Sequence, residues 1–151
     1  MTGAARDEVV TLPTADILDL RVRVLRKGTP FTHADYPEDS YADVVNFCIV
    51  RNGNPVATST WFTKECPELP GAKAVQLKGM AVADELQGSG LGALLINRGL
   101  DHARSVGASL VWARARDSAL YFYERRGFVV RGDGFMDEPT AMPHHIVVIT
   151  L

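Results

Sequence analysis

Two short segments of the chain combine residue types that suit chemistry on a bound group. The first is Gln87-Gly88-Ser89-Gly90-Leu91-Gly92-Ala93, which lies between an apolar run, Met80-Ala81-Val82, and a helical pattern. Glycine lets a backbone turn tightly and approach a ligand without an intervening Cβ. The first N–H groups of a helix lack intrahelical partners, and the helix dipole favours negative charge there. We therefore expect this glycine loop to bind a phosphate or pyrophosphate.

The second segment is Ala119-Leu120-Tyr121-Phe122-Tyr123-Glu124-Arg125-Arg126-Gly127-Phe128, which follows the pattern of a short helix and the start of a strand. Its Tyr123 carries a phenol, which can act as a general acid when it lies within hydrogen-bond reach of a leaving group. Tyr123 can equally be one helical aromatic among Tyr121, Phe122 and Phe128 that packs into the core. The residues alone leave both interpretations open.

The other reactive side chains predict neither a metal site nor a catalytic thiol. The four histidines have no Cys or carboxylate at ligand spacing, so we expect no metal. Cys48 and Cys66 form no CxxC pair and no disulfide framework, which favours a reducing compartment. Because no base lies near Cys48 in the sequence, we expect its thiol to pack in the core.

Length, charge and hydropathy limit the classes of protein that the chain can form. Its 151 residues fit one domain, residues 1–151, with a sizeable core. A net charge of -2 argues against a nucleic-acid binder that relies on positive charge. No apolar run approaches the ~18 residues of a membrane helix, and the first eight residues lack the apolar stretch of a signal peptide. We expect a cytoplasmic protein without nucleic-acid or membrane partners.

Apolar periodicity and turn residues predict the order of the elements. Thr14 is the expected N-cap of the first helix, and Asp117 or Ser118 that of the last. The helix that starts at Leu91 is expected to turn Leu91, Leu94, Leu95, Ala103 and Val106 toward the core. Asn52-Gly53 predicts a tight hairpin, and Gly107 and Gly127 predict helix ends. The expected strands are 8–12, 44–50, 55–63, 74–82, 109–113, 128–130 and 145–151, and the expected helices are 15–25, 91–106 and 119–126. This order indicates an α+β fold, a mixed sheet with helices on its faces.

Two predicted loops, residues 29–43 and 132–143, are candidates for the walls of a substrate site. The first is acidic and aromatic, with Phe31, Asp35, Tyr36 and Glu38 among its residues. It can be a solvated connection, or it can face a substrate, since binding residues gather on loops. In the second case its acidity would suit a cationic acceptor.

The two motifs together resemble those of the GNAT family of acyl-CoA-dependent N-acetyltransferases. The glycine loop is similar to the family's Gln/Arg-x-x-Gly-x-Gly/Ala motif, which follows an apolar strand. The segment that begins at Ala119 is similar to the family's Ala-x-x-aromatic-Tyr-x-x-x-Gly-Phe motif. The likeness is best over residues 76–128, about a third of the chain. A partial likeness of the glycine loop to the dinucleotide fingerprint is weaker, since no acidic residue follows about 20 positions on.

The resemblance implies a mostly antiparallel central sheet, splayed between the strands at about 74–82 and 109–115, with helices on both faces. Acetyl-CoA would place its pyrophosphate on the glycine loop and its pantetheine arm in the gap, paired like an added strand. A backbone N–H at or near Met80 would polarise the thioester carbonyl, and Tyr123 would protonate the leaving thiolate. The implied cofactor-binding residues are Met80, Ala81, Val82, Gln87, Gly88, Ser89, Gly90, Leu91, Gly92, Ala93, Arg116, Ala119 and Phe122.

The sequence departs from the family pattern at two places. Arg116 occupies a position that is often Asn, so an amide contact to the cofactor becomes a guanidinium contact or is lost. Where many relatives carry a Glu on the strand before the glycine loop, this chain offers Gln76 and Lys78. The base that deprotonates the acceptor is therefore open, with four side chains or a water chain as candidates: His33, Glu65, His144 and His145.

The resemblance implies transfer of an acetyl group from acetyl-CoA to a primary amine, carried by a small molecule or a peptide, by direct attack and without a covalent enzyme intermediate. A non-catalytic acyl-CoA-binding or regulatory module is the alternative, because the strand before the glycine loop lacks the Glu and because Arg116 stands where Asn is often found. Many relatives form homodimers through their last strands, and the apolar residues 146–151 would permit one here.

Overall fold

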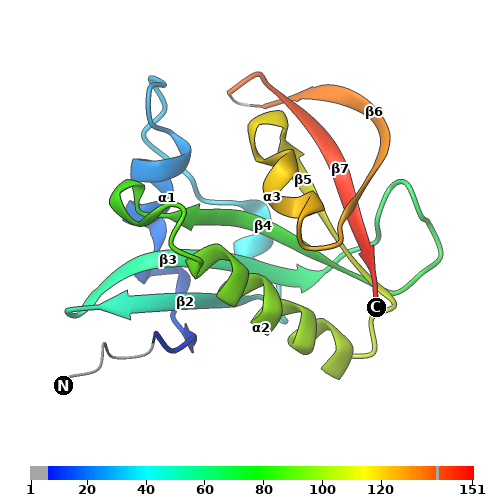
Figure 1. Cartoon of the computed structure of the whole chain (residues 1–151), viewed down its shortest axis with the longest axis horizontal. Helices are drawn as coiled ribbons and strands as arrows, with labels where there is room; N and C mark the ends of the chain where they lie inside the picture. The colour runs from blue at the N-terminus through cyan, green and yellow to red at the C-terminus, as the bar shows by residue number, and fades with distance from the viewer. Residues whose placement is uncertain (1–6, 139) are drawn as a thin grey trace.

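A computed structural model of the chain describes residues 7–138 and 140–151, and its seven strands form one sheet (Figure 1). The strand order is β1-β2-β3-β4-β5-β7-β6, and every neighbouring pair is antiparallel except β4 with β5. The strands are β1 (Val10–Thr11), β2 (Val45–Arg51), β3 (Asn54–Thr63), β4 (Ala74–Val82), β5 (Leu110–Arg116), β6 (Val129–Asp137) and β7 (Met142–Thr150). The α-helices are α1 (Leu18–Leu25), α2 (Leu91–Ser105) and α3 (Leu120–Glu124). The predicted α+β fold with a mostly antiparallel sheet is confirmed.

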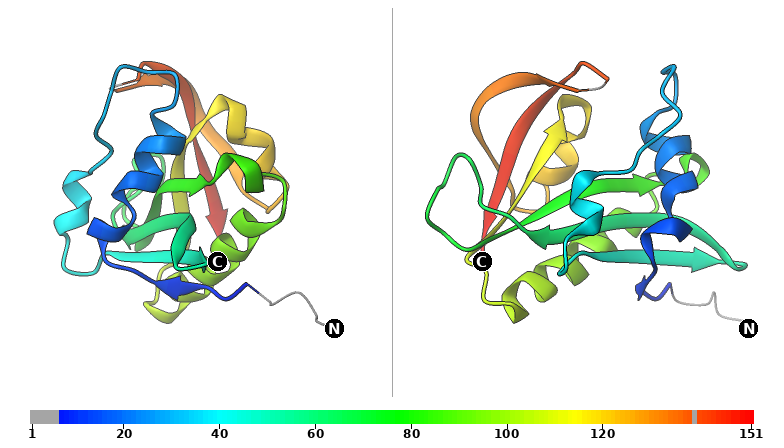
Figure 2. Two further views of the ribbon diagram at one scale, coloured as in Figure 1. Left: turned by 90° about the vertical axis from the view of Figure 1, so that its left-hand side faces the viewer. Right: turned by 180° about the vertical axis from the view of Figure 1, so that it is seen from behind.

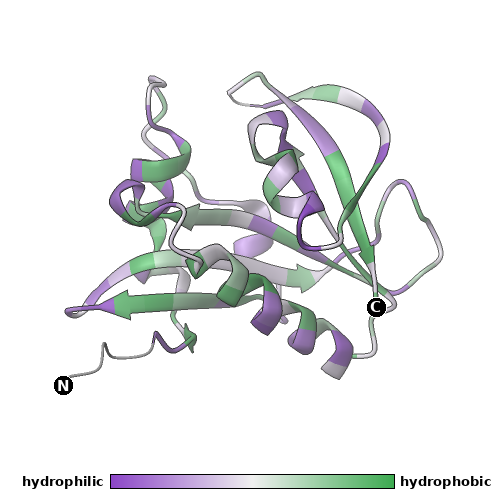
Figure 3. Ribbon diagram, viewed as in Figure 1, coloured by the Kyte–Doolittle hydropathy of each residue, from purple (hydrophilic) through white to green (hydrophobic). Residues whose placement is uncertain are grey.

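Helices cover both faces of the sheet, as expected (Figure 2). The helix α2 places a stripe that includes Leu95 and Ile96 against Trp61 of β3, and Figure 3 shows hydrophobic and hydrophilic residues alternating around its axis. A Cβ at Gly99 would lie 1.9 Å from the Trp61 ring, so glycine lets this helix approach the sheet closely. On the other face Leu20 of α1 packs against Ala81 of β4.

The sheet opens between its two parallel strands. The pairing of β4 with β5 runs from Ala74 opposite Leu110 to Leu77 opposite Ala113 and then stops. Beyond this point β4 continues to Val82 and β5 to Arg116, and the two strands diverge in Figure 1. The expected splay is therefore present, and the facing backbone of residues 78–82 has no partner in β5.

A β-bulge at Gly79 changes which side chains of β4 face each helix layer. Thr58 pairs with Ala81 and Thr60 with Lys78, so Gly79 and Met80 lie opposite the single residue Ser59. Gly79 has φ +67, a backbone conformation that favours glycine. Below the bulge the odd-numbered residues Val75 and Leu77 belong to the α2-side core, and above it the even-numbered Met80 and Val82 pack there.

The predicted polar loop at 132–143 is wrong, because most of it belongs to a hairpin. The strand β6 continues to Asp137 and β7 begins at Met142. The pairing passes from Arg131 opposite Ile146 to Phe135 opposite His144, so three residues with two glycines oppose one residue of β7. A bulge in an exposed edge strand thus has the composition of a loop.

Three smaller expectations at the helices are also wrong. The side chain of Thr14 caps no helix and instead accepts a hydrogen bond from Asn46 Nδ2 at 3.1 Å. Neither Asp117 nor Ser118 caps α3, whose N-cap residue is Ala119. Leu94, expected in the core, is 40% exposed. The glycine helix ends are confirmed, with φ +81 at Gly107 and φ +92 at Gly127.

Two other expectations concern the ends and the thiols of the chain. Cys48 and Cys66 are free and buried, and burial raises the pKa of the Cys48 thiol. The strand β7 lies between β5 and β6, and the apolar side chains of Ile146, Val147 and Val148 are buried within the chain. No helix in the described ranges is long and apolar enough to cross a membrane. Residues 1–6, which carry most of the segment searched for a leader, lie outside the described part.

Candidate active site

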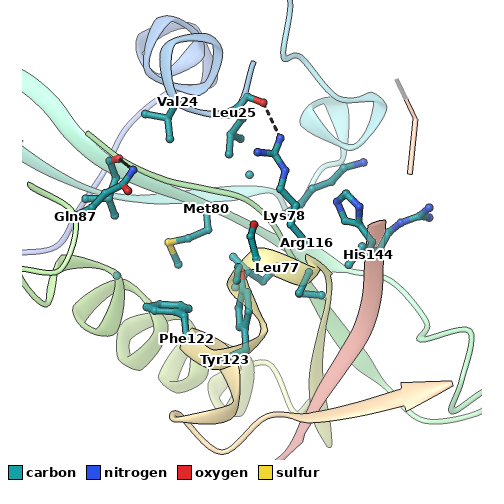
Figure 4. Close-up of a pocket in the computed structure, with 18 of the residues that line it drawn as sticks. Val24, Leu25, Leu77, Lys78, Met80, Gln87, Arg116, Phe122, Tyr123 and His144 are labelled. Carbon is teal, nitrogen blue, oxygen red and sulfur yellow. Dashed lines mark hydrogen bonds between the residues drawn. The ribbon is translucent and has the colours of Figure 1, made fainter. Parts of the chain in front are cut away.

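A cavity of about 860 Å³ occupies the opening between β4 and β5 (Figure 4). It extends from the glycine loop, past α3 and the end of α1, to the β6–β7 hairpin. Every predicted cofactor residue lines it except Ala81 and Ser89. Ala81 faces α1 because the bulge reverses the alternation there. Ser89 turns its hydroxyl back onto the carbonyl oxygen of Leu86.

The glycine loop presents backbone rather than side chains to the cavity. Gly88 and Gly90 have φ values of +81 and +89, and nothing lies within 4 Å of the Cβ that either residue lacks. The side-chain amide of Gln87 donates to the carbonyl oxygen of Val82 at 3.1 Å, which ties the loop to the end of β4. Since α2 begins at Leu91, the N–H groups of its first turn have no intrahelical acceptor and can bind an anion.

Phe122 of α3 lies against the start of α2. A Cβ at Gly92 would lie 2.8 Å from Phe122 Cζ, so this glycine makes room for the ring. The guanidinium of Arg126 lies over this ring at 4.0 Å from the ring centroid, and its buried Nε has no hydrogen-bond partner among the described residues. This end of the cavity thus combines free backbone N–H groups, an aromatic wall and a cation.

Tyr123 lies between the two ends of the cavity. It packs edge-on against Phe122 and Phe128, with ring centroids 5.2 and 5.3 Å away, and it is only 6% exposed. It also lines the cavity, so it is a core aromatic and a candidate acid at once. Burial raises the pKa of its phenol above the ordinary value, which keeps the proton on the oxygen at neutral pH.

A buried arginine holds the loop beside the other end of the cavity. Arg21 of α1 is 0% exposed and donates to both carboxylate oxygens of Asp39 at 2.8 Å, to the carbonyl oxygen of Ala34 at 3.0 Å and to Thr60 Oγ1 at 2.7 Å. Its guanidinium lies 4.3 Å from the centroid of the Tyr36 ring. These contacts fix the loop of residues 29–43 over β3 and β4.

The acidic side chains of this loop are satisfied within the protein. Glu38 accepts from Lys64 Nζ at 2.7 Å and from Lys78 Nζ at 3.0 Å, and Lys78 also lies 4.5 Å from the Tyr36 ring centroid. Burial by itself raises the pKa of Glu38, but the hydrogen bonds from both lysines outweigh it and lower the pKa to about 2. Within residues 29–43 the cavity is lined by Tyr36 and by no acid. Of the two interpretations left open for this loop, an acidic wall for a cationic acceptor does not hold, although Tyr36 faces the cavity.

Among the four candidate bases, His144 is the one that lines the cavity. Its ring is stacked on Phe135, and Nδ1 lies 2.7 Å from the carbonyl oxygen of Met142. A carbonyl oxygen only accepts, so Nδ1 donates and Nε2, 3.7 Å from Asp137 Oδ2, carries the lone pair of the neutral ring.

The remaining candidates lie elsewhere. His145 contacts Asp117 at 2.6 Å, and Glu65 accepts from the Gly71 N–H at 2.8 Å. His33 lines a separate hollow beside α1, and His102 packs edge-on against Phe47, where burial lowers its pKa. No group of three His, Cys, Asp or Glu within the described ranges is arranged to hold a metal ion.

Sequence reasoning missed part of the wall. The end of α1 lines the cavity with Val24, Leu25 and Arg26, although helical periodicity only predicted a helix packed on the sheet. Arg116 faces this wall, and its Nη2 donates to the Leu25 carbonyl oxygen at 2.6 Å (Figure 4). Helix periodicity separates buried from exposed faces but does not show that the last turn borders a cavity.

Comparisons with known proteins agree with this geometry. The model of the acetyltransferase (GNAT) family matches residues 15–128. A relative from Bacillus subtilis (strain 168), described as the uncharacterized N-acetyltransferase YitI, is 26% identical over 144 residues, or 95% of this chain and 96% of the relative. The fold is similar to an acyl-CoA N-acyltransferase from Pseudomonas aeruginosa (TM-score 0.75, 20% identity, 95% and 99% coverage) and to Escherichia coli ElaA (TM-score 0.75, 18% identity, 95% and 99% coverage).

Proposed function

The chain belongs to the GNAT acetyltransferase family, and we propose that it transfers an acetyl group from acetyl-CoA to a primary amine by direct attack. One observation carries the proposal: the cavity joins a glycine loop of free backbone N–H groups to a buried tyrosine and then to a polar end. An anion-binding end, a proton donor and a separate second-substrate end are what a two-substrate acyl transfer requires.

The cofactor would lie along backbone. The loop from Gln87 to Ala93 and the first turn of α2 would bind the pyrophosphate through N–H groups. Residues Met80–Val82 of β4, which face the gap left by β5, would pair with the pantetheine arm as an added strand, beside Ala119 and Phe122. Acetyl-CoA supplies the acetyl group as a thioester.

Three groups of the chain would then act on the reacting atoms. The backbone N–H of Met80, beside the bulge, would donate to the thioester carbonyl oxygen as charge develops there. His144 Nε2 would take the proton that the amine loses as its nitrogen bonds to the carbonyl carbon. Tyr123, whose phenol is protonated at neutral pH, would give its proton to the sulfur when the C–S bond breaks.

The test is a comparison of Tyr123→Phe with Tyr41→Phe, since Tyr41 is 38% exposed and does not line the cavity. With acetyl-CoA and a panel of amines, release of free thiol reports turnover. We expect Tyr123→Phe to lower kcat by about 10²-fold with little change in KM for acetyl-CoA, and Tyr41→Phe to leave both near the wild-type values.

The alternative function, a non-catalytic acyl-CoA-binding module, makes a different prediction. It predicts coenzyme A binding by calorimetry, no thiol release with any amine, and no effect of either substitution. Absence of both binding and turnover would overturn the acetyltransferase and the binding module together. Homodimer formation and cytoplasmic location stay predictions.

A further inference from the structure

The polar end of the cavity holds two cations without anionic partners. Arg26 Nε donates to the His33 carbonyl oxygen at 3.0 Å, and Arg116 Nη2 to that of Leu25 at 2.6 Å. Neither forms an ion pair with a carboxylate in the described part of the chain. The residues outside that part, 1–6 and 139, include no Asp or Glu.

Two cations on neighbouring strands are paired, in contrast to Arg26 and Arg116. Lys78 Nζ lies 3.0 Å from Glu38 Oε1, and Arg114 Nη2 lies 2.8 Å from Asp137 Oδ1. Arg116 is half-buried, and burial, together with the nearby Arg26 guanidinium, lowers its pKa. Two like charges close together at a partly buried site are unfavourable unless an anion joins them. The wall between α1 and β5 therefore has an unmet requirement for negative charge.

The location of this charge separates it from the cofactor phosphates. Along β5, Val111 and Ala113 belong to the core on the α2 side, whereas Trp112 belongs to the core on the opposite face. Arg114 and Arg116 continue the alternation of Trp112 and so lie on the α1 side of the sheet. Figure 4 shows Arg116 beside Leu25 and away from Gln87 of the glycine loop. An anion bound by Arg26 and Arg116 would therefore belong to the second substrate and not to the cofactor.

A second unmet requirement lies on the same face of the sheet. Gln76 of β4 lines the cavity and is 2% exposed, and its Oε1 has no hydrogen-bond partner among the described residues. An amide oxygen accepts only, so it requires a donor such as an amine N–H. An anion for the arginines and a donor for Gln76 can be supplied by one small molecule.

We propose that the acceptor is an amine that also carries an anionic group, a carboxylate or a phosphate, and that Arg26 and Arg116 bind this group. The proposal rests on the proposed acetyltransferase function and specifies its second substrate. Each guanidinium can offer two parallel N–H donors to a planar carboxylate or to a phosphate. Asp137 and Glu138 also line the cavity, which suits an acceptor with a positive amine at its other end.

The test uses acceptors in matched pairs that differ only in the anionic group. One arm compares an α-amino acid with its primary amide, and a second compares aminoethyl phosphate with ethanolamine. With acetyl-CoA present, we expect kcat/KM to be about tenfold or more higher for the anionic member of at least one pair. The arm that shows the preference identifies the carboxylate or the phosphate.

Three glutamine variants locate the effect. We expect Arg26→Gln and Arg116→Gln each to lower kcat/KM for the anionic acceptor by roughly tenfold or more, with the neutral partner and KM for acetyl-CoA little changed. Arg23→Gln is the matched control, because Arg23 lies on α1 in an exposed pair with Asp19. Urea unfolding checks each variant, and Arg26→Gln decides the question if Arg116→Gln does not fold.

The outcomes separate this proposal from the function on which it rests. Equal turnover of anionic and neutral amines overturns the acceptor class and leaves the acetyltransferase standing. A preference for anions that neither variant alters overturns the assignment to the two arginines. A rise in KM for acetyl-CoA, rather than for the acceptor, in Arg116→Gln returns that residue to the cofactor site. No turnover of any amine overturns both proposals.

Discussion

The two ends of the cavity are built in different ways. The glycine-loop end is formed by short continuous segments, residues 80–93 and 119–123, and it presents mostly backbone and apolar side chains. The polar end takes side chains from α1, the loop of residues 29–43, β4, β5 and the β6–β7 hairpin, and six of them are charged: Arg26, Lys78, Arg114, Arg116, Asp137 and Glu138. A backbone site needs only local geometry, whereas a charged site needs distant segments to meet and to be compensated.

This difference predicts that substitutions at the two ends affect different properties. At the polar end the same contacts hold the fold and shape the site, so substitutions should change stability. At the glycine-loop end a substitution can obstruct the ligand while the core stays intact. Three measurements test the contrast, in order of decreasing effect.

The largest effect is expected from Arg21→Met. The substitution removes the hydrogen bonds that Arg21 donates to Ala34, Asp39 and Thr60. It also leaves the Asp39 carboxylate, whose side chain is only 12% exposed, without its ion pair. Breaking a buried pair by removing one partner costs about 3–5 kcal/mol. Urea unfolding should show a loss of this size, and the control Arg23→Met, in an exposed pair, should lose about 0.5 kcal/mol or less. Similar losses in both variants would contradict a structural role for the Arg21 contacts.

A smaller effect, on binding, is expected from Gly92→Ala. The new Cβ would lie 2.8 Å from Phe122 Cζ, so this ring, which lines the cavity, must shift. Kd for acetyl-CoA should rise by about tenfold, which corresponds to ~1.4 kcal/mol, as measured by calorimetry. Alanine is the better helix former, so the free energy of unfolding should change by less than about 1 kcal/mol.

Rescue shows whether the Phe122 ring transmits that effect. The double variant Gly92→Ala, Phe122→Leu leaves space for the new methyl group and should bind acetyl-CoA more tightly than Gly92→Ala alone. Binding that stays weak in the double variant would mean that the methyl group obstructs the ligand directly.

The smallest effect is the pH dependence that Glu38 gives to the polar end. Its pKa in the fold is about 2, compared with 4.5 for the free side chain. A lowered pKa means that the carboxylate stabilises the fold fully above pH 4.5 and that this contribution is lost as the pH falls from 4.5 towards 2. In Glu38→Gln the unfolding midpoint in urea should vary less over this window than in the wild type. Equal pH slopes would show that Glu38 does not carry the dependence.

The contrast also explains what the sequence could predict. The glycine loop and the Tyr123 segment are local motifs, and the family resemblance that they carry implied the splay of the sheet. The structure places both segments around one cavity. The partners of Arg21 are Ala34, Asp39 and Thr60, and no local pattern connects α1 to a residue of β3 39 positions away. The acidity of residues 29–43 suggested a cationic ligand because the sequence does not show Lys64 and Lys78 beside Glu38.

Element boundaries failed where tertiary structure overrides composition. The bulge in β6 contains Gly132-Asp133-Gly134, whose residue types are those of a turn, and pairing with β7 extends the strand past it. Because the strand was not predicted to reach this far, the position of Asp137 was not predicted either. Asp137 pairs with Arg114 and lies beside His144. Leu94 fits an apolar stripe by type alone, yet its direction on α2 leaves it at the surface.

The bulge at Gly79 has a consequence for how the gene of this protein can change. Deleting this one codon would make the pairing of β3 with β4 regular, because Met80 alone would then lie opposite Ser59. Met80 and Val82 would stay on the α2 side and Ala81 on the α1 side, so the core would keep its residues and β4 would lose the extra twist that a bulge gives to a strand. A side chain at position 79 would instead need a backbone φ of +67 and would place its Cβ 2.9 Å from the Tyr36 ring, so this codon is easier to lose than to change.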